Sequence, residues 1–194
     1  ELGISGYTDY RWLPKQTKEM ARAIVKHLGI EALDTVLDFG CARGYVVKAL
    51  RELGYKAYGY DLSVWAVENA DPEVYHYLTR SQVLAFGPDS RHEWIIAKDV
   101  LEHVPQVDET ITALLSAARI GVFAVIPLSM FDGQPYVVAD YEKDVTHIHR
   151  LSLSSWAKMF MRPGWSVTGC YMVPGVKANY QTWEWGNGFT TARR

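Results

Sequence analysis

Residues 35–44 read Thr35-Val36-Leu37-Asp38-Phe39-Gly40-Cys41-Ala42-Arg43-Gly44. The first five residues are mostly apolar and form a run short enough for a buried strand, and the glycines that follow allow a tight turn. Apolar residues return at helical spacing over 45–53, and Gly54 is placed to end that helix. The run therefore predicts a strand, a glycine-bearing turn and a helix.

The same alternation continues on both sides of this run. Residue spacing predicts helices at 15–28, 45–53, 64–70, 107–119 and 154–161, and strands at 35–39, 56–60, 74–78, 94–98, 121–126, 165–172 and 189–192. Strands that alternate with helices favour a parallel sheet with both faces covered. We predict an α/β fold: a Rossmann-like, doubly wound, mostly parallel seven-stranded sheet with helices on both faces.

The chain is expected to form a single domain over residues 1–194. Its length suits one hydrophobic core, and it contains no internal repeat or linker that would divide it. Residues 1–30 are expected to form an N-terminal helical cover. Residues 127–150 are polar and longer than an ordinary connection, which predicts a lid or binding loop.

Composition and charge exclude several classes of function. The formal net charge is −2 and the basic residues are scattered, which does not favour a nucleic-acid partner. The two cysteines, Cys41 and Cys170, lie far apart in the sequence, as is usual in a reducing compartment, so we expect a cytoplasmic protein. No apolar run reaches the ~18 residues that a membrane span needs, so no membrane partner is expected.

A nucleotide-like ligand is expected beside the first glycine turn. In an open parallel sheet the ligand lies outside the carboxyl ends of the strands, and an acid about 20 residues further on can bind ribose hydroxyls; Asp61 follows at that interval. A carboxylate at Asp38 would repel a pyrophosphate, and Ala42 replaces the second glycine of the dinucleotide pattern. S-adenosylmethionine (SAM) carries cationic groups and no phosphate, so it fits this turn better than a dinucleotide.

At three ordered motifs the chain resembles the class I SAM-dependent methyltransferases, in the small-molecule branch that includes the ubiquinone-biosynthesis type. The motifs are residues 36–44, residues 59–63 (Gly-Tyr-Asp-Leu-Ser) and residues 97–104 (Ala-Lys-Asp-Val-Leu-Glu-His-Val). The resemblance covers about Thr35 to Trp165. It implies SAM as the cofactor and methyl transfer to a small-molecule acceptor.

The resemblance also implies roles for individual residues. Asp61 would hold the ribose and Leu62 would pack on the adenine, while Tyr10 would fold over the cofactor and Ser81 or a backbone group would meet the adenine amino group. The residues expected along the methionine part and the methyl end are Asp38, Gly40, Cys41, Ala42, Gly44, Lys98, Asp99 and Val100. Helix or turn capping by Asp38 and Asp61, and a purely packing role for Cys41, remain open alternatives.

Two histidines are candidates on the acceptor side. His103 follows the predicted strand at 94–98, and His147 lies in the segment 144–150, which resembles an Asp-x-Thr-His segment of this family. In an extended segment His147 and His149 would point to one side. We expect His103 and His147 to orient or deprotonate the acceptor; a metal site is the less favoured alternative, because a His-x-His pair without a defined third ligand is a weak signal.

Other functions remain in competition. A SAM-binding partner subunit without catalysis, a methyltransferase acting on nucleic acid or protein, and a nicotinamide-dependent oxidoreductase all use related folds. The acceptor, the atom that is methylated and the oligomeric state are not assigned by the sequence.

Overall fold

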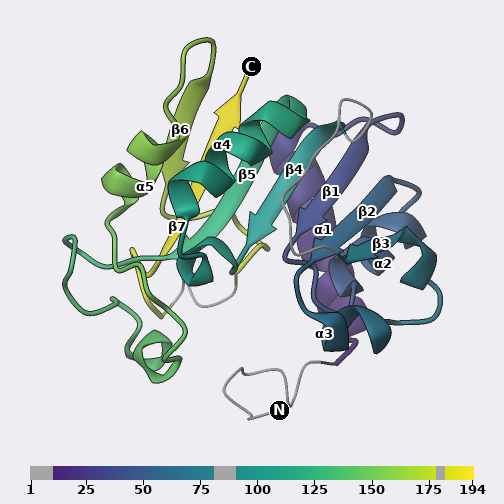
Figure 1. The fold of residues 1–194 in the computed structure, drawn as a ribbon, viewed down its shortest axis with the longest axis horizontal. Helices are drawn as coiled ribbons and strands as arrows, with labels where there is room; N and C mark the ends of the chain where they lie inside the picture. The colour runs from purple at the N-terminus through teal and green to yellow at the C-terminus, as the bar shows by residue number, and fades with distance from the viewer. Residues whose placement is uncertain (1–10, 81–90, 178–181) are drawn as a thin grey trace.

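The structure, a computed structural model, describes residues 11–80, 91–177 and 182–194. Tyr10 and Ser81 lie outside the described residues. Seven strands form one sheet in the order β3-β2-β1-β4-β5-β7-β6 (Figure 1). The strands are β1 (Thr35–Phe39), β2 (Lys56–Asp61), β3 (Leu78–Arg80), β4 (His92–Lys98), β5 (Ala118–Pro127), β6 (Ser166–Cys170) and β7 (Asn187–Arg193).

The first five strands pair in parallel, whereas β7 runs antiparallel to both β5 and β6. The predicted fold class is therefore confirmed, with an antiparallel pair at one edge. The helices are α1 (Pro14–Leu28), α2 (Tyr45–Glu52), α3 (Val64–Glu68), α4 (Val107–Ala117) and α5 (Leu153–Phe160), with short 3₁₀ turns η2 (Tyr75–Tyr77), η3 (Leu101–His103) and η4 (Ala139–Lys143).

Two hydrophobic clusters cover the two faces of the sheet. On β4, Trp94 and Ile96 join a cluster with α1 and α2, whereas Ile95 and Ala97 join one with α4 and α5. Neighbouring residues of a strand point to opposite faces, so an apolar run of this kind is what a strand buried on both faces requires. Figure 1 shows α4 and α5 together on one side of the sheet.

Several element boundaries differ from the prediction, and at two of them buried residues belong to another element. The third strand occupies Leu78–Arg80 instead of 74–78, because a 3₁₀ turn precedes it and Val74 reaches the core from that turn, where it is 2% exposed. Helix α4 ends at Ala117 and β5 begins at once at Ala118, without the expected connection. In both places buried apolar residues belong to a different element from the one that their spacing indicated.

No helix within the described ranges is both long enough and apolar enough to cross a membrane. The carboxyl ends of β1, β2 and β4 lie side by side in the sheet, since β1 pairs in parallel with both neighbours. This is the edge at which ligands bind in open α/β sheets.

Candidate functional site

A cavity of about 620 Å³ opens at this edge. Its size is typical of sites for small organic ligands. Its wall combines the turn after β1, the end of β2, the segment after β4 and parts of 127–150. The lining residues are Asp38, Phe39, Gly40, Ala42, Val46, Tyr60, Asp61, Leu62, Lys98, Asp99, Val100, Glu102, His103, Val104, Pro127, Asp140, Tyr141, Asp144, Thr146, His147 and Lys177.

The turn after β1 needs glycine where it approaches the segment after β4. Gly40 has φ 78°, and a Cβ at this position would lie 2.5 Å from a methyl carbon of Val100. Ala42 also has a positive φ, 48°, which is strained for a residue with a side chain. Its amide donates a 2.7 Å hydrogen bond to Asp61 Oδ2, which holds the turn against the end of β2.

Asp61 has a structural role as well as a place in the cavity wall. Its Oδ1 accepts a 2.7 Å hydrogen bond from the Ser63 amide, just before α3. The cap of α3 is Ser63, whose hydroxyl accepts a hydrogen bond from the Ala66 amide, so Asp61 supports the turn before the helix without capping it, and its carboxylate lines the cavity. Because each carboxylate oxygen can accept more than one hydrogen bond, Asp61 keeps acceptor capacity for ligand hydroxyls.

Asp38 is buried beneath the turn and is only 4% exposed. Burial raises the pKa of Asp38 to about 7; the positive charge of Lys98 opposes this shift and the negative charge of Asp61 adds to it. A cationic ligand group beside Asp38 would favour its ionised form. The position thus suits an ammonium group better than an anion.

Lys177 is a site residue that the sequence analysis did not identify. Its Nζ lies 2.7 Å from Asp99 Oδ1, and Lys98 forms a second ion pair with Asp99. Burial opposes ionisation of Asp99, but the two lysines, Lys177 first, lower its pKa below the usual value. Lys177 lies far along the chain in an irregular segment, so no local pattern connects it with the strand-end motif.

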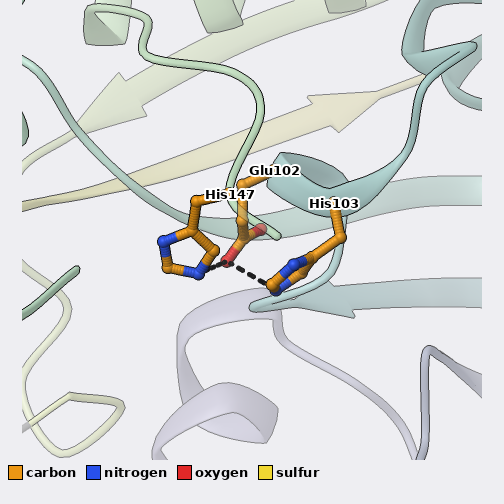
Figure 2. A group of neighbouring side chains, drawn as sticks. All are labelled: Glu102, His103 and His147. Carbon is orange, nitrogen blue, oxygen red and sulfur yellow. Dashed lines mark ion pairs between the residues drawn. The ribbon is translucent and has the colours of Figure 1, made fainter. Parts of the chain in front are cut away.

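Glu102, His103 and His147 form a cluster in the cavity wall, and all three side chains point toward one another (Figure 2). Glu102 Oε1 lies 3.9 Å from His103 Nε2 and 4.0 Å from His147 Nε2. Burial, and then the charge of Asp99, raise the pKa of Glu102. Burial and the neighbouring His147 lower the pKa of His103. Sequence reasoning quoted Glu102 within its motif without giving it a role.

Some predicted residues lie elsewhere. Cys41 is 2% exposed and packs toward Gly59, where an added Cβ would lie 2.7 Å from its sulfur; Gly44 is the N-cap residue just before α2 and lies against Leu78. Neither is among the cavity-lining residues, which fits the packing alternative for Cys41. His149 does not share the side of His147 as expected: its Nε2 lies 2.7 Å from the Val104 carbonyl oxygen and its ring packs on Trp156.

The chain matches a family model and is similar to several solved structures. A family model described as a methyltransferase domain matches residues 12–168. A SAM-dependent methyltransferase from Archaeoglobus fulgidus has a similar structure, with 14% sequence identity, a TM-score of 0.74 and 97% of each chain covered. The comparison with curated proteins finds no match.

Two further structures are similar at low identity. A plantazolicin methyltransferase in complex with a monoazolic desmethylPZN analog and S-adenosylhomocysteine (SAH) has 13% identity and a TM-score of 0.71, with 98% of this chain and 88% of that chain covered. Magnesium protoporphyrin IX methyltransferase from Synechocystis PCC 6803, with bound SAM, has 18% identity and a TM-score of 0.63, with 93% and 80% covered.

Proposed function

The chain belongs to the family of methyltransferase domains, and from this premise we propose that it transfers a methyl group from SAM to a small-molecule acceptor. It is a SAM-dependent methyltransferase with the class I Rossmann-like fold. Its cofactor supplies, when bound, a methyl group activated on a sulfonium ion.

The residues on the cofactor side suit a cationic adenosine compound without phosphate. Asp38 and Asp61 line the cavity beside the turn after β1, which favours ammonium and sulfonium groups there and disfavours a pyrophosphate; the charge of Asp99 is balanced by Lys98 and Lys177. We assign Asp61 to the ribose hydroxyls, Leu62 to the adenine and Asp38 to the amino-acid ammonium. The backbone of the turn at Gly40 completes this side.

The observation that carries the proposal is that a single cavity holds both sets of residues. Asp61 and Leu62 line it from β2, and His103 and His147 line it from the segment after β4 and from residues 127–150. Methyl transfer mainly requires that an acceptor be aligned with the methyl group and that water be excluded. We assign the alignment to His103 and His147, and the exclusion of water to 127–150 acting as a lid.

The net charge of the chain and the name of one similar structure support a small-molecule acceptor. The net charge of −2 does not favour a nucleic-acid substrate. One similar structure is named for a small compound, magnesium protoporphyrin IX.

The test is methylation by the purified chain in fractionated small-metabolite extracts with methyl-labelled SAM. We expect SAH to form together with one product that is heavier by one methyl group, and both signals to fall in Asp61→Asn at SAM concentrations near the wild-type dissociation constant. Binding of SAM without turnover in any fraction would support a non-catalytic partner subunit. Label found only in protein or nucleic acid would contradict a small-molecule acceptor.

A further inference from the structure

Three potential metal ligands converge in the cavity wall from two separate parts of the chain. Glu102 and His103 belong to η3, directly after β4, whereas His147 comes from the segment 127–150 (Figure 2). One ligand atom from each of the three side chains lies within 4.8 Å of the other two. Two ligands about 2.1 Å from a shared tetrahedral ion are about 3.4 Å apart, so small side-chain rotations complete such a site.

In the neutral form of the two histidines, their hydrogen bonds leave both Nε2 atoms without a proton. His147 Nδ1 lies 2.9 Å from the Tyr141 carbonyl oxygen, which can only accept, so Nδ1 carries the proton. His103 Nδ1 lies 2.8 Å from Thr146 Oγ1. That hydroxyl donates its only proton to Asp144 Oδ1 at 2.5 Å, so it accepts from His103. Both Nε2 lone pairs therefore face the space beside Glu102.

Partners of this kind are typical of metal-binding histidines. A histidine ligand usually donates its second N–H to a carbonyl or to a group linked to a carboxylate, which fixes the tautomer and the orientation of the ring. His147 has the carbonyl of Tyr141, and His103 has Thr146 backed by Asp144. Thr146 is thus a positioning residue for His103.

The Glu102 carboxyl group is buried, and one of its oxygens has no hydrogen-bond partner among the described residues. It is 1% exposed, and its Oε2 finds no hydrogen-bond partner in the part of the chain that the structure describes. The contacts of Oε1 with the two histidines, at 3.9 and 4.0 Å, are too long for hydrogen bonds. A buried carboxylate oxygen without a partner is unfavourable, and a cation between the carboxyl group and the two Nε2 atoms would satisfy it.

We propose that Glu102, His103 and His147 bind one divalent transition-metal ion, best matched by Zn²⁺, and that this ion takes an oxygen atom of the methyl acceptor as a further ligand. Two imidazole nitrogens and one carboxylate are the donor set of zinc sites that keep an open position. All three residues line the cavity, so that position faces the ligand space. The acceptor part rests on the proposed function; the metal part does not.

An acceptor hydroxyl on such an ion would lose its proton to solvent more readily, because a bound cation lowers the pKa of a coordinated oxygen. The substrate class is therefore an oxygen acceptor, such as a phenol or another hydroxyl compound. This extends the role of the two histidines from alignment to metal binding.

The metal part is tested on the full chain after chelator treatment, without SAM or acceptor. Zn²⁺ is titrated by calorimetry, and Co²⁺ by the visible absorption that low-symmetry cobalt sites show. We expect one ion per chain, and at least ~100-fold weaker binding in Glu102→Gln, His103→Ala and His147→Ala. Thr146→Val keeps all three ligands but removes the contact that positions His103, so we expect its Zn²⁺ affinity to fall by ~10–100-fold.

Matched controls separate this site from surface imidazoles. His76 is exposed. His149 lies on the same segment as His147, but its Nε2 is hydrogen-bonded to the Val104 carbonyl oxygen. His76→Ala and His149→Ala are expected to bind Zn²⁺ as the wild type does, and circular dichroism shows which variants fold. Absence of stoichiometric Zn²⁺ or Co²⁺ binding, or equal binding by a folded His147→Ala, would overturn the metal part.

The acceptor part is tested with acetohydroxamate, a small chelating oxygen ligand, added to the Co²⁺ protein. A changed cobalt spectrum is expected, and an unchanged one at saturating probe would overturn the open position. SAM calorimetry run separately distinguishes the two proposals. Metal binding without SAM binding contradicts the proposed function and the acceptor part that rests on it, but leaves the metal part standing. SAM binding without metal binding contradicts only this inference.

Discussion

The Asp61 carboxylate accepts hydrogen bonds from two backbone amides and, by our assignment, also binds the ribose. A test of ribose binding therefore needs a substitution that disturbs the amide contacts as little as possible. Asp61→Ala would remove both amide contacts, those of Ala42 and Ser63. Asp61→Asn keeps one oxygen acceptor and most of the shape. We expect Asp61→Asn to weaken SAM binding by about 1–3 kcal/mol, or roughly 5- to 150-fold, because a charged hydrogen bond is lost.

Calorimetry with SAM measures this change. The exposed carboxylate of Asp108, replaced in Asp108→Asn, is a control that should leave SAM affinity unchanged. Wild-type affinity in folded Asp61→Asn would remove Asp61 from the cofactor site.

The pKa of Asp38, raised to about 7 first by burial, predicts a pH dependence of SAM binding. An ammonium group binds the ionised carboxylate, so the dissociation constant should fall as pH rises, by up to about tenfold per pH unit below about 7, and then level off. Calorimetry between pH 5.5 and 8.5 checks this. Asp38→Asn should bind more weakly and show a flat profile over the same range; a wild-type slope in this variant would contradict the assignment.

The same pKa shift has the opposite effect on the stability of the free protein. The folded-state pKa of Asp38 lies above its ordinary value of 3.8, so the folded chain holds this proton more tightly. The stabilisation is complete below about pH 4 and is lost as pH rises through 7. In urea titrations without SAM, we expect Asp38→Asn to remove this loss of unfolding free energy between pH 5 and 8.

Individual site residues were predictable where chemistry and sequence spacing coincide. The nearness of Asp38 and Asp61 follows from strand ends that meet at one sheet edge, and both line the cavity. The sequence did not indicate a role for Glu102, because acidic residues often follow strands and local spacing does not show that this one is buried. Cys41 was predicted to lie along the ligand, but its side chain is buried, since a turn residue can point toward the core as well as toward the cavity.

At the scale of elements, periodicity predicted the sheet and its helices but not every boundary. The apolar residues of 74–78 indicated a strand, and Val74 is indeed buried, but it reaches the core from a 3₁₀ turn. Buried turns and buried strands share the same composition, so only the pairing of β3 with β2 distinguishes them. For the same reason the direct junction of α4 with β5 was not visible in the sequence.

Glu93 connects three strands at the edge opposite the cavity and provides a test of sheet stability. Its Oε2 accepts hydrogen bonds from the Thr35 amide and hydroxyl at 2.9 and 2.7 Å, and its Oε1 pairs with Arg119 at 2.9 Å. Burial opposes ionisation, but the Thr35 bonds and Arg119 lower the pKa of Glu93 to about 2. The first residues of β1 and β5 are thereby tied to β4.

We expect Glu93→Gln to lower the free energy of unfolding at pH 7 by about 1–3 kcal/mol, because charged hydrogen bonds are lost. The folded-state pKa lies below the ordinary 4.5, so the wild-type stabilisation exists above that value and is lost as pH falls toward 2. Urea unfolding between pH 2 and 7 measures both effects. The exposed Glu19, replaced in Glu19→Gln, should change neither; a wild-type pH profile in Glu93→Gln would disprove the role of this carboxylate.

At the scale of the whole molecule, the site is assembled from segments that share no local pattern. Residues 127–150 bring His147 to the cavity, and Lys177 pairs with Asp99 from a segment 78 residues further along the chain. Sequence reasoning reached His147 through a resemblance but had no route to Lys177. Such pairings depend on how loops return to the sheet edge, and loop paths carry little periodic signal.

Ligand binding to the folded chain should be visible in its overall stability, which tests the SAM assignment against the dinucleotide alternative. A ligand that binds only the folded state stabilises it by about 2.7 kcal/mol at 100 times its dissociation constant. For a chain of this length, each kcal/mol raises the midpoint of thermal unfolding by about 2–4 °C. We therefore expect SAM at that concentration to raise the midpoint by roughly 5–11 °C in scanning calorimetry. NADH should give no shift, because the carboxylates around the turn repel its pyrophosphate. A shift with NADH and none with SAM would contradict the charge argument on which the cofactor side is built.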